Sequence, residues 1–268
     1  MGHEFTGKVV SAGSAVKTVQ VGDKVVSSFT VSCGECFYCR IGGSARCVQA
    51  RLFGTKALDG AQAEYVRVPL ADGTVVKAPD TISDQALVLM ADIFPTGYFG
   101  VKSAVDMAQG IDFEDATVVV IGCGPVGLCA VIAAAHRRPR HLFAVDSIED
   151  RLKQAQSLGA EPMNFLTDEQ GMDRRVREVT DGRGADNVIE VVGLSSALRT
   201  AFDLVRPFGT ISSIGVHNGE IPWTGNEAYG KNARLQIGRC PVRSVFPEAL
   251  ALLAEKQHQL KKKRAALC

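Results

Sequence analysis

The sequence predicts an α/β protein in which a doubly wound parallel sheet follows a smaller, β-rich first half with a metal-binding lobe. Three observations lead to this fold class. Short alternating apolar segments fill residues 7–76, whereas buried strands alternate with helices after residue 117. Four cysteines crowd into residues 33–47. A glycine-rich turn at residues 122–127 lies between a predicted strand and a predicted helix.

The first half reads as short strands separated by turns. We predict strands at residues 8–10, 24–26 and 63–68, and a Gly22-Asp23 turn precedes the second of them. The apolar spacing becomes helical over residues 81–109. These signals predict a β-rich domain that gives way to a helix before the second half begins.

The cysteine-rich segment has the spacing C-x2-C-x2-C-x7-C, formed by Cys33, Cys36, Cys39 and Cys47. The short gaps let neighbouring sulfurs converge on one ion, and the longer arm brings the fourth sulfur round to complete a tetrahedron. Disulfides and free buried thiols are the alternatives. No apolar signal segment opens the chain and the other cysteines are scattered, so we predict structural Zn²⁺ in a cytoplasmic protein.

Composition excludes two classes of partner. The chain has 30 Lys+Arg against 29 Asp+Glu and a net charge of +1, so no basic face is expected to bind nucleic acid. No uncharged apolar run reaches the roughly 18 residues that a membrane span needs. A basic run at residues 261–264 ends a polar segment that starts at 257, and we interpret it as a solvated tail.

The second half alternates strands with helices along the chain. Strands are predicted at residues 117–121, 142–145, 188–192 and 210–216, and helices at 127–135, 149–158 and 197–205. Ser147 and Asp150 have the spacing of a capping box for the second of these helices. The succession predicts a parallel sheet covered by helices.

The turn after the first of these strands fits G-x-G-x-x-G. Gly122 permits the tight turn, Gly124 lets a pyrophosphate approach the backbone, and Gly127 lets helix and strand pack closely. Pro125 loses no hydrogen bond in the first helical turn, where it precedes Val126. The free N–H groups and the dipole of the helix favour phosphate at this end. The context therefore predicts a dinucleotide site.

Asp146 ends the next predicted strand, where a carboxylate can accept both ribose hydroxyls of an adenosine. A 2′-phosphate would meet that carboxylate as a like charge, and the next residue is Ser147 rather than Arg. This favours NAD over NADP. The alternative is a turn Asp that caps the following helix.

Two further segments complete a resemblance. Gly2-His3-Glu4 opens the chain, and Asp92 shortly precedes Thr96-Gly97-Tyr98. With the cysteine lobe and the glycine turn, these motifs resemble the zinc-dependent medium-chain dehydrogenases, which join a GroES-like catalytic domain to a Rossmann coenzyme domain. The resemblance runs from Gly2 to about residue 255. Asp92 at this position and residues 238–243 look like the formaldehyde-dehydrogenase-like branch.

The resemblance implies roles for particular residues. His3 and Asp92 would be ligands of a catalytic Zn²⁺, with Glu4 as an adjacent or exchangeable ligand. The backbone of Ile214, Gly215 and Val216 would face the nicotinamide ring. The implied domains are 1–92, a partial GroES-like catalytic domain; 93–240, a Rossmann NAD-binding domain; and 241–268, a catalytic remnant with a divergent basic tail.

The resemblance also implies missing pieces. Family members carry a strand-rich segment before the GHE motif, with a cysteine ligand and a Ser or Thr that starts the proton relay, and a closing segment that completes the catalytic domain. We therefore expect the catalytic half to be incomplete at both ends and this chain to bind NAD with negligible turnover.

The implied reaction is hydride transfer between an alcohol, or an aldehyde hydrate, and NAD, with zinc as the Lewis acid. A non-catalytic NAD- and zinc-binding remnant of such an enzyme is the alternative. A zinc-free quinone reductase is disfavoured, because it needs neither the cysteine lobe nor GHE. We also expect a homo-oligomer that pairs through the outer strand at residues 235–238.

Overall fold

The structure is a computed structural model that describes residues 1–261. The chain forms two compact units: one combines Met1–Pro95 with the segment that begins at Cys240, and the other is Thr96–Arg239. The predicted solvated tail is only partly tested. Residues 257–261 belong to a helix rather than to a solvated tail, and the Gln257 side chain bonds to the backbone of Thr81 and Ser83. Residues 262–268 lie outside the described residues.

The first unit contains a small antiparallel sheet with strand order β1-β2-β3. The strands are β1 (Thr6–Lys8), β2 (Lys24–Ser27) and β3 (Val75–Lys77). In the same unit Val31, Phe53 and Leu58 form a small core. The predicted strand at 24–26 is confirmed. The one at 63–68 is wrong as a strand: its valines pack on this core, but the segment forms no ladder with another described strand.

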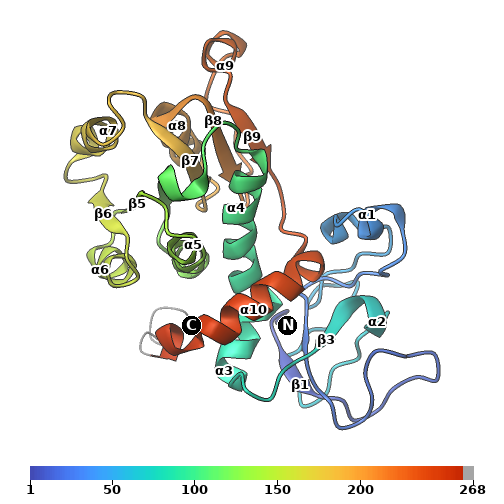
Figure 1. Ribbon diagram of the computed structural model, residues 1–268. Helices are drawn as coiled ribbons and strands as arrows, with labels where there is room; N and C mark the ends of the chain where they lie inside the picture. The colour runs from blue at the N-terminus through green and yellow to red at the C-terminus, as the bar shows by residue number, and fades with distance from the viewer. Residues whose placement is uncertain (262–268) are drawn as a thin grey trace. The chain divides into compact units, whose positions relative to one another are not determined.

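The remaining elements of this unit are short, apart from its last helix (Figure 1). They are α1 (Phe37–Arg40), η1 (Ser44–Arg46), α2 (Ala71–Thr74), α3 (Asp84–Leu87), η2 (Val88–Ala91) and α10 (Val242–Lys261). Helix α10 packs against α3, η1 and η2. Its buried side chains include Phe246 and Leu253, and it continues past Pro247.

The second unit is built on a six-stranded parallel sheet with strand order β6-β5-β4-β7-β8-β9. The strands are β4 (Thr117–Ile121), β5 (His141–Asp146), β6 (Glu161–Asn164), β7 (Ala185–Glu190), β8 (Val205–Ser213) and β9 (Arg234–Ile237). Strands β4 and β7 are buried along their whole length. The predicted α/β class with a doubly wound parallel sheet is confirmed.

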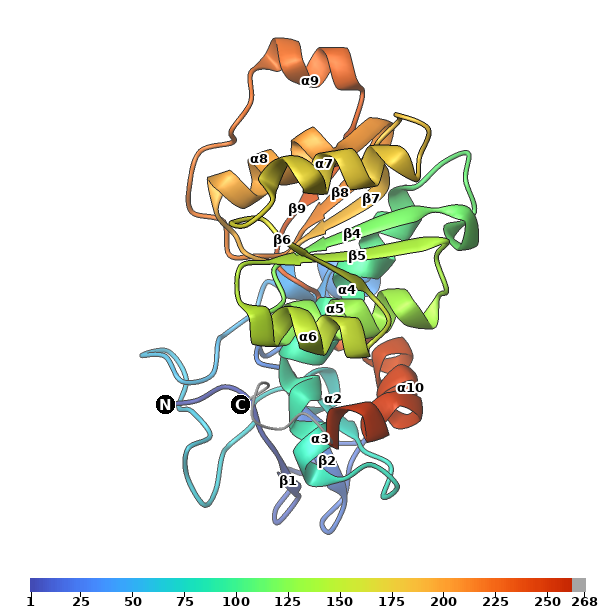
Figure 2. The same ribbon diagram turned by 90° about the vertical axis from the view of Figure 1, so that its left-hand side faces the viewer.

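Helices cover both faces of this sheet (Figure 2). One face carries α7 (Glu169–Glu178) and α8 (Ser195–Leu204), and the other carries α4 (Ile93–Met107), α5 (Pro125–His136) and α6 (Glu149–Ser157). The connecting elements are η3 (Phe113–Asp115) and α9 (Gly225–Lys231). Val119, Phe143, Val188 and Leu198 are among the core residues. None of the helices within residues 1–261 combines the length and apolarity of a membrane span.

The predicted capping box before α6 is wrong. The N-cap position is Ile148, which has no side-chain cap bond. The Asp146 carboxylate instead accepts the N–H groups of Ser147 and Ile148, at 2.7 and 2.9 Å. The carboxylate of the last strand residue thus takes the Ser147 N–H, which a capping box would have left to the Asp150 side chain.

Candidate functional site

Four thiols lie together in the first unit. The Sγ atoms of Cys33, Cys36, Cys39 and Cys47 all lie within 4.8 Å of one another, and all four cysteines are free rather than in disulfides. Sulfurs bound tetrahedrally to one zinc at about 2.3 Å lie about 3.8 Å apart. The Cys33 and Cys47 sulfurs are 3.6 Å apart. The donor set and its spacing fit one ion, so this lobe is a structural zinc site.

Backbone groups of the lobe favour sulfur in its ionised form. The N–H of Cys33 donates to the Cys47 sulfur at 3.2 Å, and that of Cys36 to the Cys33 sulfur at 3.3 Å. The N–H groups of Cys39 and Val48 lower the pKa of Cys36 to about 6, whereas burial raises the pKa of Cys39 to about 12. Without metal, Cys36 therefore ionises more readily than Cys39; zinc would require all four cysteines as thiolates.

A second pair of candidate ligands lies in the same unit. His3 Nε2 is 3.3 Å from Asp92 Oδ2, and the imidazole ring also lies 5.7 Å from the Phe29 ring. The hydrogen bond to Asp92 raises the pKa of His3. Zinc bonds of about 2.0–2.1 Å would place a nitrogen and an oxygen ligand about 3.3 Å apart. The separation of this pair thus suits a shared ion as well as a direct hydrogen bond.

Glu4 lies beside this pair without completing a three-ligand cluster. Partial burial and the charge of Asp92 raise the pKa of the Glu4 carboxyl, while the backbone N–H of Ile93 opposes that shift. Within residues 1–261, the four cysteines are the only group of three or more potential metal ligands that the fold brings together. The assignment of His3, Glu4 and Asp92 to a catalytic metal stays a prediction.

The glycine turn lies between β4 and α5. Gly122 has φ +95°, a left-handed conformation that favours glycine. Gly124 is the N-cap of α5, Pro125 and Val126 begin the helix, and a Cβ on Gly124 would meet no atom within 4 Å. A Cβ on Gly127 would lie 1.8 Å from the Gly122 carbonyl oxygen. The turn therefore leaves the helix N-terminus open to an anion.

Asp146 is buried at the end of β5 and its carboxylate faces the same turn. Oδ2 accepts the N–H of Cys123 at 2.8 Å and lies 3.8 Å from an Arg151 nitrogen. Together with its bonds to Ser147 and Ile148, this makes Asp146 the link between the glycine turn and the start of α6. Asp146 therefore lies at the predicted position, and its bonds reach the two residues before α6 without capping the helix itself.

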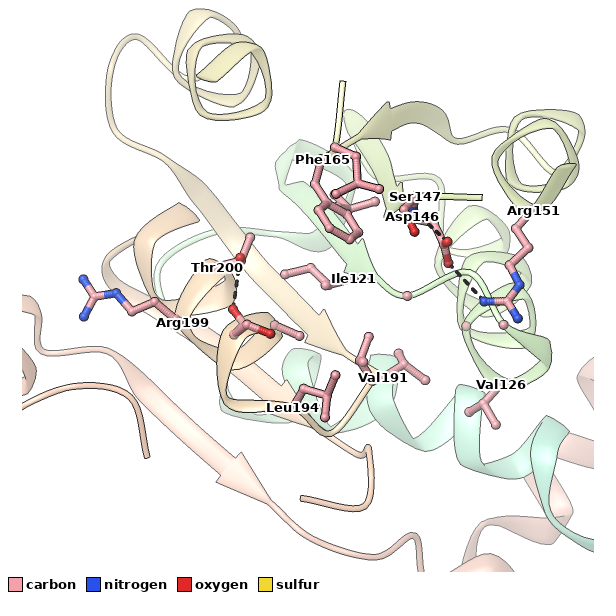
Figure 3. A pocket seen from close by; sticks show the side chains of 18 of the residues that line it. Ile121, Val126, Asp146, Ser147, Arg151, Phe165, Val191, Leu194, Arg199 and Thr200 are labelled. Carbon is pink, nitrogen blue, oxygen red and sulfur yellow. Dashed lines mark hydrogen bonds and ion pairs between the residues drawn. The ribbon is translucent and has the colours of Figure 1, made fainter. Parts of the chain in front are cut away.

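These groups line one cavity of about 780 Å³, which we name the glycine-loop cavity (Figure 3). Its walls include the glycine turn and the end of β5 at Asp146 and Ser147. Further wall residues follow β6 (Phe165, Leu166), follow β7 (Val191, Val192, Leu194) or lie on α8. Sequence reasoning missed Arg151, Phe165 and Arg199 as wall residues. A basic residue one turn into α6 was the available signal for Arg151; nothing in the pattern marked the other two.

The predicted nicotinamide segment lies outside this cavity wall. Ile214, Gly215 and Val216 follow β8; Ile214 is buried and Val216 is 81% exposed. A Cβ on Gly215 would lie 2.2 Å from the nitrogen of Gly193, so the segment abuts the loop after β7. The three residues do not line the glycine-loop cavity, and their role stays a prediction.

Two family models match the chain. The model for the alcohol dehydrogenase GroES-like domain matches residues 1–80, and the model for zinc-binding dehydrogenase matches residues 125–255. The first match contains the cysteine lobe and His3. The second begins at the first residue of α5 and extends into α10.

Curated relatives agree with these matches. Zinc-type alcohol dehydrogenase B of Aspergillus flavus is 65% identical over 260 residues, which are 97% of this chain and 61% of that protein. The medium chain reductase/dehydrogenase ucsI of an Acremonium species is 58% identical over 229 residues, 85% of this chain and 78% of that relative. The chain thus spans 61% of the length of the first relative.

Solved structures share the fold. Alcohol dehydrogenase TADH from Thermus sp. ATN1 has a TM-score of 0.86 at 36% identity, over 95% of this chain and 73% of that one. The alcohol dehydrogenase rspB from E. coli, solved in complex with NADH, has a TM-score of 0.79 at 26% identity, over 94% of this chain and 71% of that one.

Proposed function

Because the chain belongs to the zinc-binding medium-chain alcohol dehydrogenase family, we propose that it is part of an oxidoreductase that transfers hydride between an alcohol, or an aldehyde hydrate, and NAD. The observation that carries the proposal is the glycine-loop cavity, in which an open helix N-terminus and a buried acidic residue face the same space. These are the two chemical groups that a dinucleotide requires, one for pyrophosphate and one for ribose.

The proposed roles follow the chemistry of the cavity wall. The N–H groups at the start of α5 bind the pyrophosphate, and Gly124 leaves room for it. Asp146 accepts the ribose hydroxyls with lone pairs that its backbone bonds leave available. The apolar side chains of Phe165 and Leu194 offer a surface for the adenine. NADH bound to the E. coli relative supports this proposal by likeness of fold.

We propose NAD rather than NADP. Asp146 would repel a 2′-phosphate, and Ser147 has no charge to attract one. Arg151 is a cation on the same wall, but it already lies 3.8 Å from the Asp146 carboxylate. Near this pair a 2′-phosphate gains one attraction and meets one repulsion, whereas ribose hydroxyls meet an acceptor.

We propose that His3 and Asp92 hold a catalytic zinc, with Glu4 as an exchangeable neighbour. When bound, zinc supplies a Lewis acid that lowers the pKa of an alcohol oxygen. The 3.3 Å separation of His3 Nε2 and Asp92 Oδ2 supports the assignment. The cysteine lobe has a different task, because a closed set of four thiolates leaves no open position for substrate.

The second candidate is an NAD- and zinc-binding protein without turnover. One observation favours it. His3 and Asp92 lie within bonding distance of each other, but among the described residues no third potential ligand joins them in a cluster. A metal on few ligands is weakly held and poorly oriented, and a misplacement of about 1 Å can cost on the order of a hundredfold in rate.

One experiment separates the two candidates. NADH binding is followed by fluorescence titration, and NADH production is measured with primary and secondary alcohols in added zinc. The enzyme proposal expects binding together with turnover that His3→Ala lowers by about 100-fold or more while binding is retained. Binding without turnover supports the second candidate. A chain that is folded but does not bind NADH contradicts both.

We further propose that the protein forms a homo-oligomer through β9, which is the edge strand of the six-stranded sheet. Leu235 and Ile237 on this strand are 38% and 39% exposed. An exposed edge with apolar side chains can pair with its own copy across a two-fold axis.

A further inference from the structure

A buried acidic residue lies at the carboxyl end of β7 and is not one of the proposed coenzyme or metal ligands. Glu190 is the last residue of the strand and is 0% exposed. A carboxylate is costly to bury unless hydrogen bonds replace its water shell. The donors that surround Glu190 therefore determine whether it has a function.

Three uncharged donors satisfy this carboxylate. Oε1 accepts the N–H groups of Val192 and Gly193, each at 2.7 Å, and Oε2 accepts the hydroxyl of Ser213 at 2.6 Å. Ser213 is the last residue of β8 and is also fully buried. One side chain thus joins the ends of two neighbouring strands and holds the loop that leaves the first of them.

The loop that Glu190 holds, Val191–Gly193, packs between the glycine turn and the segment that follows β8. A Cβ on Gly122 would be 2.7 Å from Cγ2 of Val192, so the loop packs against the glycine turn. On its other side Gly193, with φ +82°, allows no Cβ, because that atom would lie 2.7 Å from the Val216 carbonyl oxygen.

The loop is also part of the cavity wall. Val191 and Val192 line the glycine-loop cavity, and Leu194 continues the wall toward α8. Turning the loop away would remove the side of the cavity opposite Asp146. Whatever fixes the 191–193 backbone therefore fixes part of the cavity wall.

We propose that Glu190 is a positioning residue for the coenzyme: its buried carboxylate presets the Val191–Gly193 loop so that the glycine-loop cavity is formed before NADH binds. The inference rests on the proposed function, because it names NADH as the molecule whose binding depends on the loop. Preorganisation raises affinity by removing the cost of ordering the loop on binding.

The same strand offers a matched control. Asp186 is also a buried acid on β7, but it is near the opposite end of the strand. There it accepts hydrogen bonds from the Thr117 N–H at 2.7 Å and from the Arg206 Nε–H at 2.5 Å. It does not line the cavity. Replacing it should weaken the same sheet without changing the loop.

The conservative variant separates shape from charge. In Glu190→Gln the remaining carbonyl oxygen can still accept from Val192 and Gly193, and the Ser213 hydroxyl can rotate to accept from the new amide. In Glu190→Ala both N–H groups lose their acceptor. If Glu190 only stabilised the sheet, NADH binding would not depend on whether position 190 carries an alanine or a glutamine.

The experiment compares E190A, E190Q, S213A and D186N with the unmodified chain by NADH fluorescence titration and by hydrogen exchange of the Val192 and Gly193 amides. We expect E190A to raise the Kd for NADH by about tenfold or more, and E190Q to stay within about threefold of the unmodified chain. S213A should fall between them. D186N should lower the melting temperature but leave Kd and loop protection unchanged.

Two outcomes overturn the inference. One is a folded E190A that binds NADH as tightly as the unmodified chain, and the other is a D186N that weakens binding as much as E190A. If the unmodified chain fails to bind NADH, the proposed function fails instead. In that case hydrogen exchange still tests whether Glu190 fixes the loop, because the protection of the Val192 and Gly193 amides must fall in E190A and persist in E190Q. If E190A does not fold, the Kd for NADH and the amide protection are compared between S213A and E190Q instead.

Discussion

Gly127 packs so closely against Gly122 that a Cβ on Gly127 would lie 1.8 Å from the carbonyl oxygen of Gly122. Gly124, between them in the chain, would tolerate a Cβ with no atom within 4 Å. Two glycines of one motif therefore serve different needs: one permits the packing of helix on strand, and the other keeps space open for a ligand.

This contrast predicts that alanine at the two positions has opposite effects. Gly127→Ala should destabilise the second unit by about 3 kcal/mol or more, because backbone must move. Gly124→Ala should leave the melting temperature nearly unchanged and raise the Kd for NADH about tenfold or more, because the methyl group fills the pyrophosphate position. Thermal unfolding and NADH titration of both variants check this. A Gly124→Ala protein with normal affinity would contradict the assignment of the site.

We expect one equivalent of zinc to remain with the four-cysteine lobe through purification. Cys36→Ser should lose that zinc and loosen the lobe, because metal-binding energy of roughly 10 kcal/mol in small zinc domains becomes folding energy. Cys240→Ser, outside the lobe, should keep the metal. Elemental analysis of the three proteins is the check, and absence of zinc from the unmodified chain would defeat the expectation.

Coenzyme preference should follow the charge at the end of β5. Replacing Asp146 with Ser and Ser147 with Arg removes a repulsion and adds a cation, so affinity should shift toward NADP by about tenfold or more. Asp146→Ser also leaves backbone N–H groups without their acceptor, which should cost about 1–3 kcal/mol of stability. Calorimetric titration with both coenzymes measures the shift; Ser147→Arg alone is the control. Equal or tighter NADP binding by the unmodified chain would refute the NAD assignment.

Acid should loosen the start of α9 within a defined pH window. The Thr224 backbone N–H and Arg199 lower the pKa of Glu227 from 4.5 to about 2. Since the folded pKa is the lower one, the stabilisation is complete above pH 4.5 and is lost as the pH falls toward about 2. Trp223, the single tryptophan, stacks on Phe202 beside this cap and reports the change by its fluorescence. Glu227→Gln should abolish the transition, and a transition that persists in it would assign the effect elsewhere.

Association through β9 can be tested at one side chain. Ile237→Lys places a charge on the exposed sheet edge, and we expect it to convert an oligomer into a monomer in light scattering at micromolar concentration. Phe208→Lys, a similar change at a 56% exposed residue off that strand, is the comparison. A strictly monomeric unmodified chain would contradict the proposal.

Local sequence patterns predicted two kinds of element: strands that are fully buried and helices whose hydrogen bonds are local. The β-branched run at 117–121 is β4 with the same bounds, and the prediction of a helix at 149–158 differs from α6 by one residue. The strand at 63–68 was wrong because alternation shows only which side chains can be buried. A strand also needs a neighbouring backbone to pair with, and the sequence pattern contains no information on that neighbour. Helix α7 was missed because charged residues dominate it, and strand β6 was missed because its four residues include Glu161 and Pro162 and show no apolar alternation.

The sequence by itself determined the zinc lobe and the glycine turn. In both, the residues that act together are close in the chain, so spacing alone constrains their geometry. Only the tertiary structure decided that His3 meets Asp92, that Arg151 approaches Asp146, and that Glu190 joins Gly193 to Ser213. Those contacts depend on how strand ends are brought into register and on which buried donors then remain to be satisfied, and no local pattern encodes either.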